Sequence, residues 1–233
     1  MNESIKIFSD RLKQTLINGG SINDESSDLW TLENFKNLHK AVNSNLKEGK
    51  GSFLKKISAQ IEEAKNTVPE LSEDQHKALL PLMFEILSLY YVFPSNISKN
   101  TKKEALKELL NSDNSVAKEL NLALDNFVIS RDAIMCGGIG SGGMGFNTNK
   151  QKEIFYLIDV FKDWYEQSTR AGDTYLNHDE SNFRFQNFLD NVADGRSPQC
   201  RHVLLYLFFS NYYEPIISSN QKRKLTQVFS SFY

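Results

Sequence analysis

The sequence predicts an all-α fold. Apolar residues recur at helical spacing along most of the 233 residues. Alternation at the two-residue period of a strand never extends beyond about four residues, and the only strand-like pieces are 127–130 and 216–217. With 40% hydrophobic and 24% charged residues, the composition is that of an ordinary globular protein. We therefore expect one irregular domain of about nine or ten helices.

The first three predicted helices are amphipathic. One carries an apolar stripe from Ile5 to Leu16 and ends before the pair Gly19-Gly20. A second begins after Thr31, whose hydroxyl is a favourable N-cap, and a third covers 53–61. Because each has one apolar face, we expect all three to pack against a common core.

The next predicted helices are recognised by how they begin. A capping box at 72–75 precedes an apolar run that continues to Tyr91, and Pro81 within that run predicts a kink or a break. A second capping box at 101–104 predicts a short helix, and 116–127 has the pattern of a further helix.

The last third of the chain holds 17 of the 27 aromatic residues, which predicts an aromatic core. A capping box is predicted at 148–151, and Ser197-Pro198 are predicted as the N-cap and first residue of a central apolar helix. Further helices are predicted, in order, over 154–164, 183–192, 199–209 and around 225–229.

Six glycines stand within ten residues, Cys136 to Gly145. This density predicts a loop over 137–145 with positive φ angles or close backbone approaches. The pattern G-x-G-x-x-G occurs in it twice, at Gly138, Gly140 and Gly143 and at Gly140, Gly142 and Gly145. These glycines could cradle a phosphate at the start of the next helix. That fingerprint also needs a preceding strand, which is not predicted, so a flexible or packing loop is favoured. The chain is expected to form one domain, 1–233, or two lobes, 1–130 and 146–233, joined by this loop.

Charge is balanced, with 27 Lys plus Arg against 29 Asp plus Glu and a formal net charge of −2. A generally basic nucleic-acid binder is therefore excluded, and any phosphate contact must be local. The candidate nucleic-acid ligands are Lys150, Arg201, Lys222, Arg223 and Lys224. The triplet 222–224 also fits a solvated helical face, and Arg201 with His202 fits a hydrogen-bonded structural pair.

No pattern predicts catalysis, a metal site or a cofactor. Cys136, Cys200 and the four histidines lack zinc spacing, and no G-x-x-x-x-G-K-[ST] motif occurs. Residues 1–17 carry charges throughout, unlike a signal peptide, and no apolar run approaches the ~20 residues of a membrane helix. We expect a cytoplasmic protein with free thiols, no cofactor and no membrane contact.

Several segments follow one another in a recognisable order from residue 52 to the end. They are Ser52-Phe53-Leu54-Lys55-Lys56 with Gln60, the run 89–98 with 101–103, the glycine loop leading into 145–150, then 201–209, 213–218 and 222–224. Together they resemble the helical region that precedes the AAA+ motor of McrB-like proteins, which act in type IV restriction and antiphage defence. The family usually has an aspartate at the turn where this chain has Phe209-Ser210-Asn211.

The resemblance implies a non-catalytic sensor or adaptor that recognises nucleic acid, DNA or RNA, or a phage component. An AAA+ motor and an McrC-like nuclease would be its partners in the intact system. This chain has no Walker motif, so an excised domain or a stand-alone paralogue is expected. The alternative is a structural domain that docks motor or nuclease subunits without nucleic acid. The matching residues outside the glycine loop are Asn147, Asn149, Lys150, Arg201, His202, Glu214 and 222–224.

Overall fold

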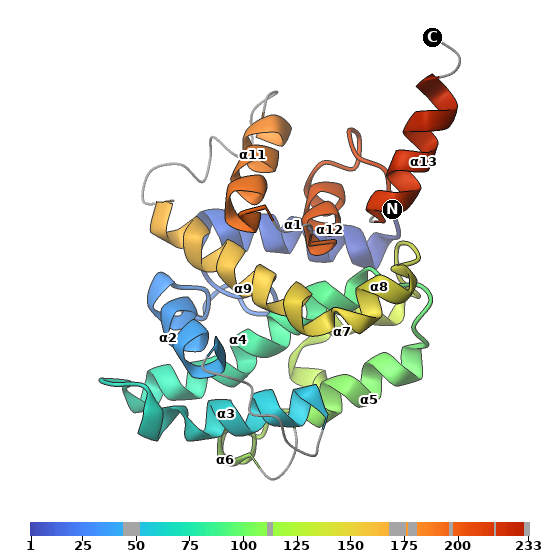
Figure 1. The fold of residues 1–233 in the computed structure, drawn as a ribbon. Coiled ribbons are helices and arrows are strands. Elements are labelled where there is room, and N and C mark those ends of the chain that lie inside the picture. The colour runs from blue at the N-terminus through green and yellow to red at the C-terminus, as the bar shows by residue number, and fades with distance from the viewer. Residues whose placement is uncertain are drawn as a thin grey trace.

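The computed structural model describes residues 1–43, 52–110, 114–167, 176, 181–195, 198–216 and 218–230, and these form an all-α fold without strands (Figure 1). Within this part of the chain we find twelve helices, where about nine or ten were expected, and the structure is 72% helical. In chain order they are α1 (Glu3–Asn18), α2 (Leu32–Asn43), α3 (Phe53–Thr67), α4 (Glu73–Val92), α5 (Lys99–Leu109), α6 (Ser115–Glu119), α7 (Val128–Met135), α8 (Gly143–Thr148), α9 (Lys150–Gln167), α11 (Ser181–Ala193), α12 (Cys200–Phe208) and α13 (Ser219–Ser230), with a 3-10 turn, η1 (Leu124–Asn126).

Helix α4 lies at the centre of the fold. Nearly every residue from Leu79 to Phe93 is buried, so this helix has no solvated face and must be surrounded by others. It packs against α2, α3, α5, α7 and α9. Pro81 lies inside α4 without dividing it, so of the two predicted outcomes, a kink or a break, the break does not occur. One continuous hydrophobic cluster includes residues of α1 to α9, of α11 and of α12.

Two predicted helix starts are confirmed by their hydrogen bonds. Ser72 and Gln75 form the expected capping box, because each side chain bonds the other residue's backbone N–H. The Thr31 hydroxyl accepts from the backbone N–H of Asn34 at 3.2 Å, as an N-cap should.

Two other predicted starts are wrong. The cap of α5 is Ser98, whose hydroxyl accepts from the Thr101 N–H, so the helix begins one turn before the predicted capping box. Thr148 ends α8 instead of opening α9, and its hydroxyl donates to the carbonyl of Met144. In both places a capping pattern occurs inside or at the far end of a helix.

The segment predicted as one helix over 116–127 is divided. Helix α6 ends at Glu119, Asn121 adopts a left-handed φ of 49°, and η1 follows before α7 begins at Val128. The strand-like piece 127–130 is therefore the start of a helix. Of the other strand-like piece, Ile216 is not in a strand and Ile217 lies outside the described residues.

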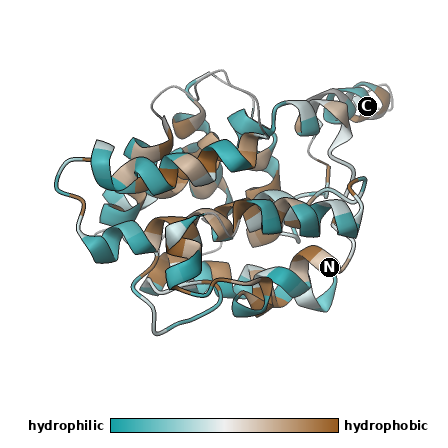
Figure 2. Ribbon diagram, turned by 90° about the horizontal axis from the view of Figure 1, so that it is seen from below, coloured by the Kyte–Doolittle hydropathy of each residue, from teal (hydrophilic) through white to brown (hydrophobic). Residues whose placement is uncertain are grey.

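Hydrophilic residues line the outer faces of the helices, as Figure 2 shows in teal. Within the described ranges, no helix combines the length and apolarity needed to cross a bilayer.

A fully buried carboxylate fixes the long loop between α1 and α2 to the centre of the molecule. Glu85 of α4 accepts hydrogen bonds from the hydroxyl of Ser21 at 2.6 Å, the backbone N–H of Ile22 at 3.1 Å and the amide of Asn23 at 2.7 Å. The indole N–H of Trp30 and the backbone N–H of Asn23 also donate to it. Burial raises the pKa of Glu85, and these donors oppose the rise.

Replacing this carboxylate tests its role. Glu85→Gln puts an amide N–H₂ among groups that all donate, so at least one buried donor loses its acceptor. We expect the free energy of unfolding to fall by about 2 kcal/mol or more. Urea denaturation measures it, with Glu63→Gln, an exposed glutamate on α3, as the control that should change little. Equal stability of the two variants would contradict the assignment.

Candidate functional site

The corner between α12 and α13 contains most of the basic residues that the sequence singles out. The start of α12 is held by Glu153 of α9, whose two carboxylate oxygens accept from the backbone N–H groups of Gln199 at 3.0 Å and Cys200 at 2.8 Å. Burial raises the pKa of Glu153. Helix α12 begins at Cys200, so Pro198 precedes the helix and is not its first residue as predicted. The predicted N-cap, Ser197, lies outside the described residues.

Arg201 projects from the first turn of α12 toward α11. Its Nη2 donates to Oδ2 of Asp190 at 2.8 Å, so an internal carboxylate neutralises its charge. The arginine thus has a structural partner in addition to its predicted role as a phosphate ligand.

His202 connects α12 to α13. Its Nδ1 accepts a hydrogen bond from Nζ of Lys222 at 2.9 Å. Burial, together with the charges of Lys222 and Arg201, lowers the pKa of His202 to about 3, although Asp190 acts in the opposite direction. Burial and the charge of Arg201 also lower the pKa of Lys222. The predicted structural pairing of Arg201 and His202 therefore includes a third residue, which anchors the base of α13.

Beyond this anchor, α13 extends away from the rest of the molecule (Figure 1). Arg223 and Lys224 are exposed, and no acidic residue occurs between 219 and 230. Leu225 is 42% exposed and Val228 57% exposed. A basic helix with outward apolar residues is a typical docking element for a partner surface. We call the surface formed by Lys224, Leu225 and Val228, which lie within about 100° of one another around the helix, the α13 face.

Lys150 lies apart from this corner, at the start of α9. Its Nζ donates to the hydroxyl of Tyr91 at 2.8 Å and stands 5.2 Å from the centre of the Tyr91 ring. Burial lowers the pKa of Lys150. The lysine is thus packed against an aromatic residue of α4.

The glycine loop packs against the turn that follows α4. Ile139 N–H donates to the carbonyl of Phe93 at 2.8 Å, and Gly140 accepts from the Ser95 N–H at 2.8 Å. A Cβ on Gly138 would lie 2.8 Å from the backbone of Pro94, and one on Gly140 would lie 2.7 Å from the carbonyl oxygen of Pro215. These close approaches favour the packing interpretation of the loop.

The loop is shorter than the predicted range 137–145, because α8 begins at Gly143 and includes Gly145. Asn149 follows α8 and donates from its amide to the Gly145 carbonyl at 2.9 Å. Asn147 is half-buried within α8, and Glu214 is exposed in the connector before α13. The structure thus places the matching polar residues in three separate regions.

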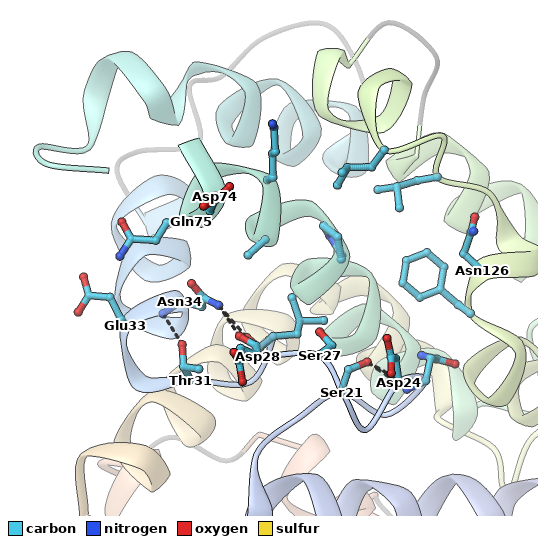
Figure 3. A pocket seen from close by; sticks show the side chains of 18 residues that line it. Ser21, Asp24, Ser27, Asp28, Thr31, Glu33, Asn34, Asp74, Gln75 and Asn126 are labelled. Carbon is cyan, nitrogen blue, oxygen red and sulfur yellow. Dashed lines mark hydrogen bonds between the residues drawn. The ribbon is translucent and has the colours of Figure 1, made fainter. Parts of the chain in front are cut away.

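A cavity of about 620 Å³ opens between the loop ahead of α2, the first turns of α4 and the segment joining α6 to α7. Figure 3 shows Glu33, Asp74 and Gln75 on one side of it and Asn126 on the other. Its rim carries four exposed carboxylates, Asp24, Asp28, Glu33 and Asp74. Its apolar lining consists of Leu29, Ala78, Pro81, Leu120, Leu122 and Phe127. We call this cavity the acidic groove.

One lysine also lines the acidic groove, but its charge is already paired. Nζ of Lys77 contacts a carboxylate oxygen of Glu73 at 2.7 Å and one of Glu119 at 2.5 Å. Leu120, beside Glu119, is 38% exposed. The groove therefore combines negative charge with accessible apolar surface. Sequence reasoning missed it, because its residues come from three segments that lie far apart in the chain.

The described part of the chain contains no group of three or more His, Cys, Asp or Glu placed to hold a metal ion. Cys200 is fully buried, and burial raises the pKa of its thiol well above the usual value. Comparison with protein-family models, with curated proteins and with solved structures finds no match to this chain. The resemblance to McrB-like proteins thus stays a prediction from the sequence.

Two glycine substitutions test the packing of the loop. Gly138 and Gly143 both have positive φ, 90° and 65°, but a Cβ at Gly143 would meet nothing within 4 Å. Gly143→Ala should therefore cost only backbone strain, roughly 1–2 kcal/mol. Gly138→Ala must also displace the Pro94 backbone, so we expect a loss of stability at least about 1 kcal/mol larger. Thermal and urea unfolding measure the stability of the two variants. Equal losses of stability would argue against the close contact between Gly138 and the Pro94 backbone.

The buried histidine predicts a pH dependence of stability. Because the folded pKa of His202 lies near 3, only the unfolded chain takes up a proton there as the pH falls below about 6.5. The stabilisation present above pH 6.5 should be lost on acidification, by up to about 2 kcal/mol at pH 5. His202→Asn keeps an acceptor for Lys222 and removes the titration, so its stability should fall less between pH 7 and pH 5. Parallel urea titrations measure the difference, and identical pH profiles would contradict the prediction.

Proposed function

We propose that the chain is a non-catalytic adaptor that docks a partner protein through the α13 face. The observation that carries this proposal is the exposure of Leu225 and Val228 on a basic helix that extends from the body. An amphipathic helix of this kind binds by laying its apolar residues into a groove. The basic residues then select a groove with an acidic rim, since opposite charges on the rim speed encounter and fix the orientation.

Anchoring at the base of α13 supports such a role. The bond between Lys222 and His202 holds the first turn against α12, and the backbone N–H of Lys222 donates to the Ser218 carbonyl at 3.0 Å. A helix that is already formed and oriented loses less conformational entropy on binding than a disordered segment.

Nucleic-acid recognition receives less support from the geometry. Arg201 is bonded to Asp190, Lys150 to Tyr91 and Lys222 to His202, so these predicted phosphate ligands already have partners within the chain. Contacts with nucleic-acid phosphates would depend mainly on the triplet 222–224, and within it Lys222 faces His202. The resemblance to McrB-like proteins offers motor and nuclease subunits, or an invader component, as candidate partners for the adaptor.

Site-specific crosslinking tests the proposal. A photoreactive amino acid at position 225 of the full chain should capture a partner protein in the cells that produce it. The same amino acid at position 7 should not, because Ile7 is equally exposed, at 48%, but lies on α1. Excess intact protein should compete with the capture, and excess Leu225→Asp variant should not.

Two outcomes would contradict the adaptor role. One is equal capture from positions 7 and 225. The other is tight, salt-sensitive binding of DNA or RNA that Lys224→Glu weakens, since this would assign the α13 face to phosphate contacts.

A further inference from the structure

The acidic groove and the α13 face have opposite charges and similar apolar character. Among the described residues, the groove rim has four exposed carboxylates, and Lys77 in its lining is paired with Glu73 and Glu119. Helix α13 has three basic residues and no acidic one. Exposed aliphatic groups occur on both, Leu120 in the groove and Leu225 with Val228 on the helix. The two surfaces are therefore complementary, because their charges are opposite and both expose aliphatic groups.

The two surfaces cannot meet within one molecule. Lys222 fixes the base of α13 to α12, whereas the acidic groove lies among the beginnings of α2 and α4 and the end of α6. In Figure 1, α13 stands at the upper right, and α2 and α6 lie at the lower left. The α13 face of one molecule can therefore reach only the groove of another.

We infer that the α13 face of one copy of this chain docks into the acidic groove of a second copy. This inference rests on the proposed function, because it names the chain itself as a partner of its own docking helix. The contact is head-to-tail, since two different surfaces meet. Each added copy then leaves one free α13 face and one free groove, so assembly continues until a ring closes or a chain of molecules forms.

The strength of the contact follows from its composition. The rim carboxylates and the basic residues are exposed in the free molecule, so their pairing is screened by salt. The apolar residues supply the part of the affinity that does not depend on salt. We expect concentration-dependent association that weakens as ionic strength rises.

Sedimentation velocity with two complementary variants of the full chain tests the inference. Leu225→Asp damages the α13 face and leaves the groove intact. The double variant Asp28→Lys with Asp74→Lys reverses two rim charges and leaves α13 intact. Each should lower the association constant about tenfold or more, and circular dichroism should show both folded. Ile7→Asp, which changes an exposed aliphatic residue of α1, is the control and should associate like the unchanged protein.

Mixing the two variants gives the decisive measurement. The intact groove of one can accept the intact α13 face of the other, so a 1:1 dimer should form and grow no further. The inference is overturned by a protein that stays monomeric at every concentration and low salt. It is equally overturned by association that survives in either variant, or by variants that do not pair when mixed. The crosslinking experiment at position 225 separates this inference from the proposed function. If self-association fails but position 225 captures a different protein, the inference is wrong and the adaptor role is still supported.

Discussion

The burial of one carboxylate in the middle of α4 constrains the rest of the structure. Glu85 has no exposed surface, and among the described residues its carboxylate is stabilised by hydrogen-bond donors and not by a neighbouring cation. The donors Ser21, Ile22, Asn23 and Trp30 all come from the loop between α1 and α2, which the carboxylate holds in one conformation. Asn23 extends the network to α7 by donating to the Ser130 hydroxyl at 2.9 Å. The same loop forms one wall of the acidic groove, so the groove depends on Glu85 for its shape.

Local rules predicted most of the helices, because amphipathic spacing and caps are encoded within a few residues. The capping box at Ser72 and Gln75 is an example, since its two partners stand three positions apart. The rules failed at Thr101 and Thr148, where the same residue types serve inside or at the end of a helix. A capping pattern alone does not show whether it lies at the start of a helix or further along it. A second capping residue nearby, such as Ser98 one turn before Thr101, is needed to locate the start.

Local rules could not predict the interactions that hold the helices together, because these join residues far apart in the sequence. Glu85 meets Ser21 across 64 positions, and Glu153 meets Cys200 across 47. A lone glutamate in the apolar run 79–92 was the signal that could have revealed the first, because a charge there must find buried partners. The candidate phosphate ligands also show that local rules do not predict tertiary partners. Arg201, Lys222 and Lys150 were identified as charges, while the groups that they bond, Asp190, His202 and Tyr91, are set by tertiary packing.

The close approach of Gly140 to Pro215 has a mechanical consequence for α13. Three backbone segments, at Phe93, Gly140 and Pro215, lie against one another just before this helix begins. At 1.5 Å per residue, the 12 residues of α13 form a lever roughly 18 Å long. A rotation of about 10° at its base would therefore move its tip by about 3 Å, nearly the spacing of one residue along a strand. Because Gly140 has no side chain, Pro215 can pack closely against it ahead of α13, and this contact supports the base of the helix in addition to the bond between Lys222 and His202.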